Sequence, residues 1–160
     1  MKLEKFKQWM EISANVGVLA GIIFLGIEIN QNTSMMKAQT RDSMTEKIVD
    51  FRYVLATNRE LAELWGGENI LEKPSGNANF FMLASLADAN FRIWENEWYQ
   101  YQQGLFDEDE MIGRLTTWES TLGNSAQYRS YWELRRGTYS ASFTKEVDGL
   151  LEKISLSNDL

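Results

Sequence analysis

The sequence predicts an all-α protein in which one apolar N-terminal helix precedes a helical domain. The chain has a single proline, Pro74, in 160 residues, and proline interrupts helices more strongly than any other residue. Runs of β-branched residues are few, and apolar residues recur at steps of three and four, which is the spacing of one helix face. We expect a membrane-spanning helix with its flanks at residues 1–33, and a helical stalk and antiparallel helical bundle at residues 34–160.

The apolar N-terminal segment has nearly the length of a membrane span. Its uncharged run, Ile12 to Ile27, would form about 24 Å of helix. Extension to Trp9 and Ile29 gives about 31 Å, close to the bilayer core of about 30 Å, and places Trp9 at the interface. Basic residues precede the run, as they do in many membrane helices: Lys2, Lys5 and Lys7. We therefore expect a single-pass membrane protein.

Two alternatives compete with the membrane span. A cleavable signal peptide fits poorly, because residues 28–33 contain no small-x-small cleavage site. A buried helix of a soluble core stays open, since the uncharged run falls between the lengths typical of the two classes.

The orientation of the helix in the membrane depends on the basic residues at its two ends. Lys37, Arg41 and Lys47 nearly balance the lysines before the run. The charge bias therefore does not assign a side of the membrane to the helical domain.

Small residues recur every four positions in the apolar segment, at Ser13, Gly17 and Gly21. We call this set the small-residue stripe. Such a stripe lets a second helix approach closely in lipid, which predicts a homo-oligomer. Further steps of three and four place Glu28 and Gln31 on the same face, so a symmetric ring would line its axis with carboxylates, as cation pores do. Alternatively, Glu28 only reaches the headgroup region.

The polar stretch from Asn30 lacks helix breakers, so the first helix is expected to continue as a stalk. Apolar residues then keep helical spacing at Met44, Ile48, Phe51 and Leu55. The sequence TNRE, residues 57–60, matches a capping box with Thr57 as the cap. It predicts a short helix through Leu61, Leu64 and Trp65 that ends at the glycine pair 66–67.

The longest predicted helix of the domain begins after a loop at residues 68–77, with Asn77 as its N-cap. Its apolar residues alternate steps of four and three, and Gly104 is the expected stop. Aromatic residues 94, 98, 99 and 101 could stack on a ring-bearing ligand, but three of the four lie on the periodic face, so core packing is favoured. The periodic face comprises Phe80, Ala84, Ala87, Phe91, Trp94, Trp98, Tyr101 and Leu105.

Asp107 is expected to begin the next helix, with acidic residues 108–110 in its first turn, where the helix dipole favours negative charge. The ligand spacing and the glycine of a calcium loop are missing from this acidic run. The predicted buried face holds Ile112, Leu115, Trp118 and Leu122, and Gly123 ends the helix. Two further helices are expected around Tyr128–Arg135 and Phe143–Ile154.

The long helix also has a polar face, made of Asp88, Arg92, Glu95 and Asn96. Their spacing suits ion pairs along a solvated helix. The alternative is a face that recognises a ligand or a protein partner, with Arg92 at its centre.

Composition excludes several classes of function. A formal net charge of -7 disfavours nucleic acid as a partner, since phosphate binding needs a surplus of Lys and Arg. The chain has no His and no Cys, which removes thiol nucleophiles, the usual zinc sites and the best proton carrier at neutral pH. There is no phosphate-binding glycine loop and no nucleophile elbow. We expect no enzymatic activity, no cofactor and no metal.

Three stretches together resemble a widespread group of small bacterial proteins without an assigned activity. They are EINQNTSMMKAQT at residues 28–40, RIWENEWYQYQQGLFDEDE at residues 92–110 and YWELRRGTYSASFTKEV at residues 131–147. Proteins of this group have one apolar N-terminal helix, a Gln-Asn-Thr signature and a helical remainder. The resemblance implies a bacterial inner-membrane location.

The layout is also similar to that of the membrane accessory protein of type VI-B CRISPR systems, which resembles a HEPN bundle on a membrane helix and assembles into a pore. HEPN ribonucleases carry an arginine followed some residues later by histidine. Here Glu97, Trp98 and Tyr99 follow Arg92 at those positions, so the proton carrier of that chemistry is missing.

These observations predict a homo-oligomeric single-span membrane protein, with a ring or pore as one arrangement of its protomers. Its partners would be copies of itself and the lipid bilayer. The alternative is a membrane-anchored helical binding module that acts through the Arg92 face.

Overall fold

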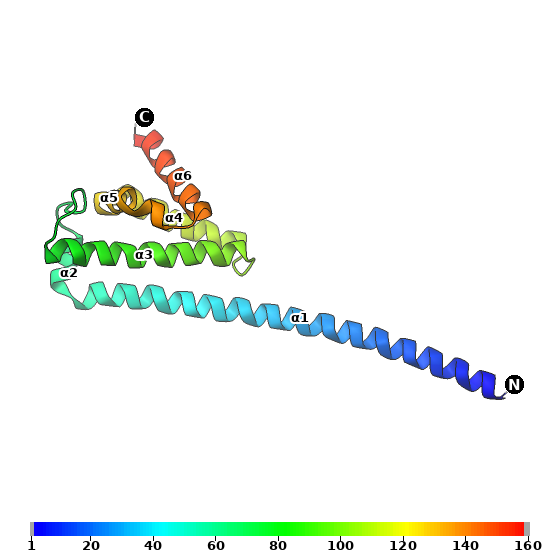
Figure 1. Ribbon diagram of the computed structural model, residues 1–160. Helices are drawn as coiled ribbons and strands as arrows, with labels where there is room; N and C mark the ends of the chain where they lie inside the picture. The colour runs from blue at the N-terminus through cyan, green and yellow to red at the C-terminus, as the bar shows by residue number, and fades with distance from the viewer. Residues whose placement is uncertain (1, 159–160) are drawn as a thin grey trace. The chain divides into compact units, whose positions relative to one another are not determined.

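The computed structural model describes residues 2–158, and these residues form helices, turns and loops with no strand. Figure 1 shows the elements in chain order. The chain divides into two compact units, residues 1–39 and residues 40–160, which are described separately. The elements are α1 (Lys2–Thr57), α2 (Arg59–Trp65), α3 (Ala78–Gln102), α4 (Glu108–Asn124), α5 (Ala126–Arg135), the 3₁₀ turn η1 (Arg136–Thr138) and α6 (Ala141–Asn158).

The first unit contains the N-terminal part of α1, and every described residue from 2 to 36 is exposed. Among the described helices, α1 alone has the length and composition of a membrane span, with a mean hydropathy of 2.0 over its best window. None of that window is buried, whereas the core helix of a soluble protein is mostly buried. The apolar segment is therefore a candidate membrane span or signal sequence, and the core-helix alternative is not supported.

The polar residues that follow the apolar segment remain helical, as predicted. Thr33 and Ser34 donate hydrogen bonds to the carbonyls of Ile29 and Asn30, at 2.9 and 3.0 Å. These bonds satisfy the hydroxyl groups within the helix itself. Because no proline or cap interrupts it, α1 continues to Thr57.

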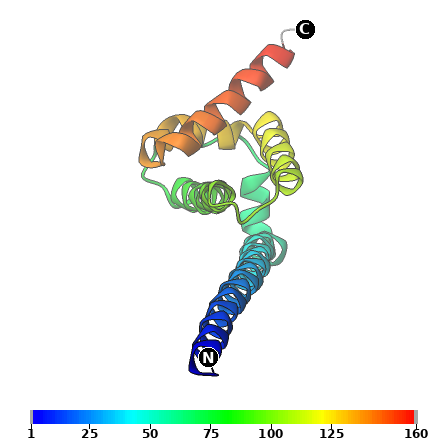
Figure 2. The same ribbon diagram turned by 90° about the vertical axis from the view of Figure 1, so that its right-hand side faces the viewer.

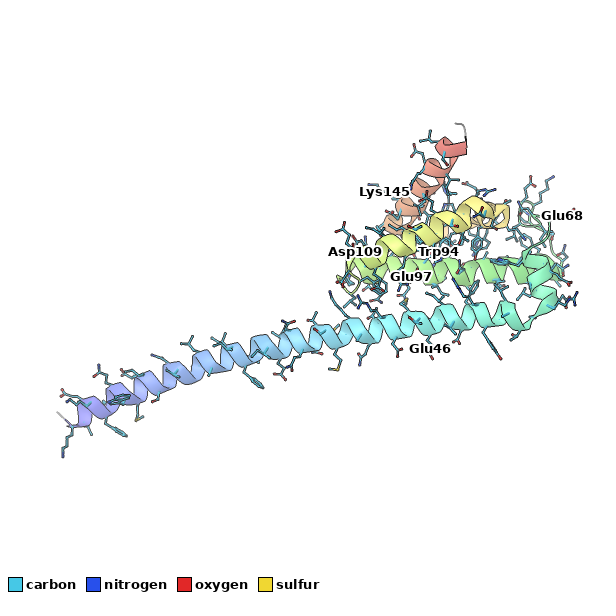
Figure 3. The ribbon with its side chains drawn as sticks, turned by 180° about the vertical axis from the view of Figure 1, so that it is seen from behind. Glu46, Glu68, Trp94, Glu97, Asp109 and Lys145 are labelled. Atoms are coloured by element: carbon cyan, nitrogen blue, oxygen red, sulfur yellow. The ribbon has the colours of Figure 1, made fainter. Side chains whose placement is uncertain are left out.

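In the second unit, α1 presents one face to the other helices. Met44 is buried, and Ile48, Phe51 and Leu55 are half-buried at the same helical spacing. This confirms the periodic face predicted for the stalk. Residues 40–57 run alongside α3, as Figures 1 and 3 show.

Local signals account for several helix ends in the second unit. The Asn77 side chain accepts a hydrogen bond of 2.8 Å from the Phe80 amide, which confirms the predicted N-cap of α3. Gly104 has a φ of 72°, a left-handed conformation that favours glycine, and it ends α3 as expected. Leu105 lies just beyond the helix, where its amide bonds to the Gln100 carbonyl at 3.0 Å.

Three predicted details are wrong. Gly123 does not end α4, which continues to Asn124 with Ser125 as its C-cap. Thr57 does not cap α2, because α1 continues through it and its hydroxyl bonds to the Tyr53 carbonyl at 2.7 Å. Asn58 is the cap instead and accepts from the Leu61 amide. Ile112 is 54% exposed, whereas its neighbour Met111 is buried. The buried face of α4 steps by four, three and four residues through 111, 115, 118 and 122, which follows the helix period more evenly.

The core of the second unit is dense in aromatic rings. Phe91 and Trp132 are fully buried, with ring centroids 5.1 Å apart. Helix α3 contacts α2, α4, α5 and α6, so it is the element around which the others pack. Figures 1 and 2 show α6 crossing the other helices obliquely. Most of the face predicted for α3 is buried or partly buried against this core, including Phe80, Ala87, Phe91 and Trp94.

Candidate ligand cleft beside a buried ion pair

A buried carboxylate lies between α3 and α4. Glu97 of α3 is only 2% exposed, and Figure 3 shows it on α3 close to Trp94. Arg114 of α4 donates to one carboxylate oxygen of Glu97, and the Trp118 indole donates to the other at 3.0 Å. Both oxygens are therefore partnered, as a buried carboxylate requires.

The ion pair extends to α1 through a chain of charges. Arg114 also donates to Glu110 at 2.9 Å, and Glu110 accepts from Arg41 of α1 at 2.6 Å. Arg41 further contacts Asp107 at 3.1 Å. Arg41 of α1 is thus paired with two acidic residues, Asp107 and Glu110, at the start of α4. Asp107 begins α4 as predicted, although its side chain makes no capping hydrogen bond.

Two carboxylates of this network, the buried Glu97 and the partly exposed Glu110, have opposite pKa shifts. Burial raises the pKa of Glu97, and this effect exceeds the lowering by Arg114 and Trp118. Burial also acts to raise the pKa of Glu110, but hydrogen bonds from Arg114 and Arg41 outweigh it, so the pKa of Glu110 is lowered. The difference follows from position, because Glu97 lies deeper in the protein.

A cleft of about 330 Å³ lies beside this ion pair. Half-buried residues of α1 form one wall, and α3 and α4 form the opposite walls. We call it the α1–α3–α4 cleft. Its lining is mainly aromatic and aliphatic, with a small polar set, which is the usual character of a small-molecule site. The lining residues are Ile48, Phe51, Arg52, Leu55, Trp65, Asn90, Ile93, Trp94, Glu97, Arg114, Thr117, Trp118, Thr121 and Tyr128.

The sequence analysis did not assign Glu97, Asn90 or Arg114 to a site. A signal was present, because Glu97 follows Trp94 by three residues and Asn90 precedes it by four, which places both on its side of the helix. Arg114 likewise precedes Trp118 by four residues.

All four residues predicted as a ligand or partner face have partners within the chain. Arg92 donates to Glu95 at 2.8 Å and lies over the Tyr139 ring, 4.3 Å from its centroid. One oxygen of Asp88 accepts from the phenols of Tyr131 and Tyr139, at 2.8 and 2.9 Å. These contacts join α3 to α5, through Tyr131, and to the segment between α5 and α6, through Tyr139.

Glu95 and Asn96 contact different elements from neighbouring positions on α3. Glu95 accepts a hydrogen bond of 2.7 Å from the Ser140 amide at the start of α6. Asn96 instead points toward α1, with its amide nitrogen 3.8 Å from the Met44 sulfur. The structure therefore brings Asp88, Arg92 and Glu95 together and separates Asn96 from them. Glu97, at one of the positions where a HEPN histidine would be considered, pairs with Arg114.

The residues predicted for self-association lie in the first unit. Ser13, Gly17, Gly21, Glu28 and Gln31 are all exposed on α1. A Cβ atom built on Gly17 or Gly21 would meet no atom within 4 Å. A second helix could therefore approach this face closely.

No protein-family model, curated protein or solved structure matches this chain. Among the described residues, no group of three or more His, Cys, Asp or Glu side chains could hold a metal ion. The site must therefore be interpreted from its own chemistry.

We predict that Glu97→Ala lowers the free energy of unfolding by about 3 kcal/mol, because it leaves the largely buried Arg114 without its deepest partner. Urea unfolding followed by circular dichroism measures the change. The control is Glu63→Ala, which breaks an exposed pair with Arg59 and should cost less than about 1 kcal/mol. Equal losses in the two variants would contradict the structural role of Glu97.

The raised pKa of Glu97 also predicts a pH dependence. Above the ordinary value of 4.5, the unfolded chain has released this proton while the folded protein still holds it, so stability falls as pH rises through the window between the two pKa values. Wild type should therefore lose stability relative to Glu97→Gln as pH increases from 4.5. Unfolding free energies of both proteins across this range test the sign, and a difference that is constant or grows in favour of wild type would refute it.

Proposed function

We propose that this chain is a single-span protein of the bacterial inner membrane that associates with copies of itself through α1. In this proposal, the helical unit at residues 40–160 is an antiparallel bundle outside the hydrocarbon layer. The observation that carries it is the complete exposure of an apolar helical segment long enough to cross a bilayer. Water would disfavour so much exposed apolar surface, whereas lipid would cover it.

The small-residue stripe supports self-association. Helices surrounded by lipid gain little from the hydrophobic effect when they meet, so close packing and hydrogen bonds provide the attraction. Gly17 and Gly21 leave the backbone open to such packing, since no atom beyond their chain neighbours and their own helix backbone lies within 4 Å of their Cβ positions.

A ring of protomers would place Glu28 and Gln31 near its axis, because both share the face of the small-residue stripe. Carboxylates arranged around an axis attract cations, so a cation-conducting pore is the functional form of this proposal. A charged side chain at this depth is also more stable facing protein or water than facing lipid.

A binding module acting through the Arg92 face is the second candidate. Asp88, Arg92 and Glu95 already bind Tyr131, Tyr139 and Ser140 within the chain. A partner at this face would have to compete with those contacts, which favours the first proposal.

The variant Gly17→Leu with Gly21→Leu should dissociate the assembly, because two leucines would separate the backbones. Light scattering of the protein in detergent measures its mass. The matched control is Gly26→Leu, which also faces open space but lies about 180° around the helix from Gly17. An unchanged mass in the double variant, or equal dissociation in the control, would refute packing through the stripe.

Glu28→Gln should reduce cation flux into liposomes that contain the protein, because it removes the charge from the proposed axis. The control is Glu11→Gln, which removes a carboxylate at the other end of the segment and off the stripe. If wild-type protein conducts no cations, the pore is excluded. If Glu28→Gln conducts as wild type does, Glu28 does not line the conducting path. Self-association is tested separately by mass.

A further inference from the structure

The α1–α3–α4 cleft contains polar groups without partners. Asn90 is 9% exposed and makes no side-chain hydrogen bond with the part of the chain that the structure describes. The phenol of Tyr128, a residue 3% exposed, also has no hydrogen-bond partner among residues 2–158. Neither group is among the fully buried side-chain atoms without a partner in the described chain, which are Trp98 Nε1, Arg114 Nε and Gln127 Oε1. Both therefore reach the open space of the cleft, where water or a ligand can pair with them. The cleft therefore presents an amide and a phenol to whatever occupies it.

The aromatic walls of the cleft suit a flat occupant. Trp118, Trp94 and Tyr128 form a continuous stack, with centroid distances of 5.3 and 5.7 Å and interplanar angles of 15° and 7°. Trp65 meets Tyr128 edge-on at 4.9 Å, and Phe51 approaches from α1. The faces of Trp94 are covered by its two neighbours in this stack. A ligand ring would therefore meet the edges of the stacked rings and the ring of Phe51, in contacts that an aliphatic chain cannot make.

The charge in the cleft favours an anion, although the whole protein is acidic. The charged lining residues are two arginines and one carboxylate. Glu97 already uses both oxygens on Arg114 and Trp118. Arg52, exposed at the edge of the cleft, forms no ion pair within the described residues. Its guanidinium can therefore bind a carboxylate from a ligand.

We propose that the α1–α3–α4 cleft binds a planar aromatic monocarboxylate of one or two rings. The ring packs between Phe51 and the Trp94–Trp118 wall, polar edge atoms meet Asn90 and Tyr128, and the carboxylate binds Arg52. The cleft volume of about 330 Å³ lies at the lower end of the range for ligand pockets, so the ligand can have only one or two rings. This binding does not depend on self-association through α1.

Calorimetric titration of full-length protein in lipid nanodiscs, with empty nanodiscs as the blank, tests the site. The probe is 2-naphthoate, which should bind saturably with a Kd of about 1 mM or tighter. Two controls separate its features: 2-naphthamide keeps the rings without the charge, and octanoate keeps the charge without the rings. Both should bind at least about fivefold more weakly, since each lacks one class of contact.

Arg52→Gln should weaken 2-naphthoate binding about tenfold and leave 2-naphthamide unchanged, because it removes only the charged hydrogen bond. The matched control is Arg59→Gln, an equally small change at an exposed arginine of α2, which should bind as wild type does. Asn90→Leu should weaken both naphthyl probes about fivefold.

The proposal is overturned by absence of saturable 2-naphthoate binding to folded wild-type protein. It is also overturned by octanoate binding as tightly as 2-naphthoate, or by Arg52→Gln binding 2-naphthoate as wild type does. Circular dichroism of each variant establishes that it is folded. Because Arg52 is exposed, its replacement leaves the core intact even if Asn90→Leu does not fold.

Discussion

The apolar residues in the first half of α1 are exposed and are not covered by any other part of residues 2–158, and this constraint determines the surroundings that the protein needs. A helical unit can bury its own aromatic residues, as Phe91 and Trp132 show, but nothing covers residues 2–36. Such a surface requires lipid, another protein or a second copy. The glycines on it reduce the bulk at one face, which suits contact with a second helix.

The second unit buries a charged side chain among aromatic residues. Glu97 remains there because Arg114 and the Trp118 indole satisfy both of its oxygens. The same arginine reaches Glu110, and Glu110 reaches Arg41 at 2.6 Å. The network therefore links Arg41 of α1 to α3 and α4, next to the cleft. A ligand in that cleft would contact α1 directly, because α1 forms one of the walls.

Sequence analysis predicted features that depend on neighbouring residues and missed those that depend on distant ones. Asn77 and Gly104 were identifiable because a cap and a left-handed turn involve only adjacent backbone. The ion pairs of Arg92 with Asp88 and Glu95 were also predictable from their spacing. The contacts of this face with Tyr131, Tyr139 and Ser140 were not, since those residues are distant in sequence. Glu97 was missed because charged residues are seldom buried, and only the α4 residues that pair with it make its burial possible. The cleft could not be predicted either, because its walls come from three helices that lie far apart in the sequence.

The absence of native cysteine allows a direct measurement of whether the first half of α1 lies in lipid, as we propose. Single cysteines at Leu19 and Tyr53, both exposed on α1, can be labelled with a membrane-impermeant maleimide in open membrane fragments. Leu19→Cys should label far more slowly than Tyr53→Cys, because hydrocarbon excludes the reagent and disfavours the reactive thiolate. Both should label fully after denaturation. Equal labelling of the two in intact membranes would contradict the account.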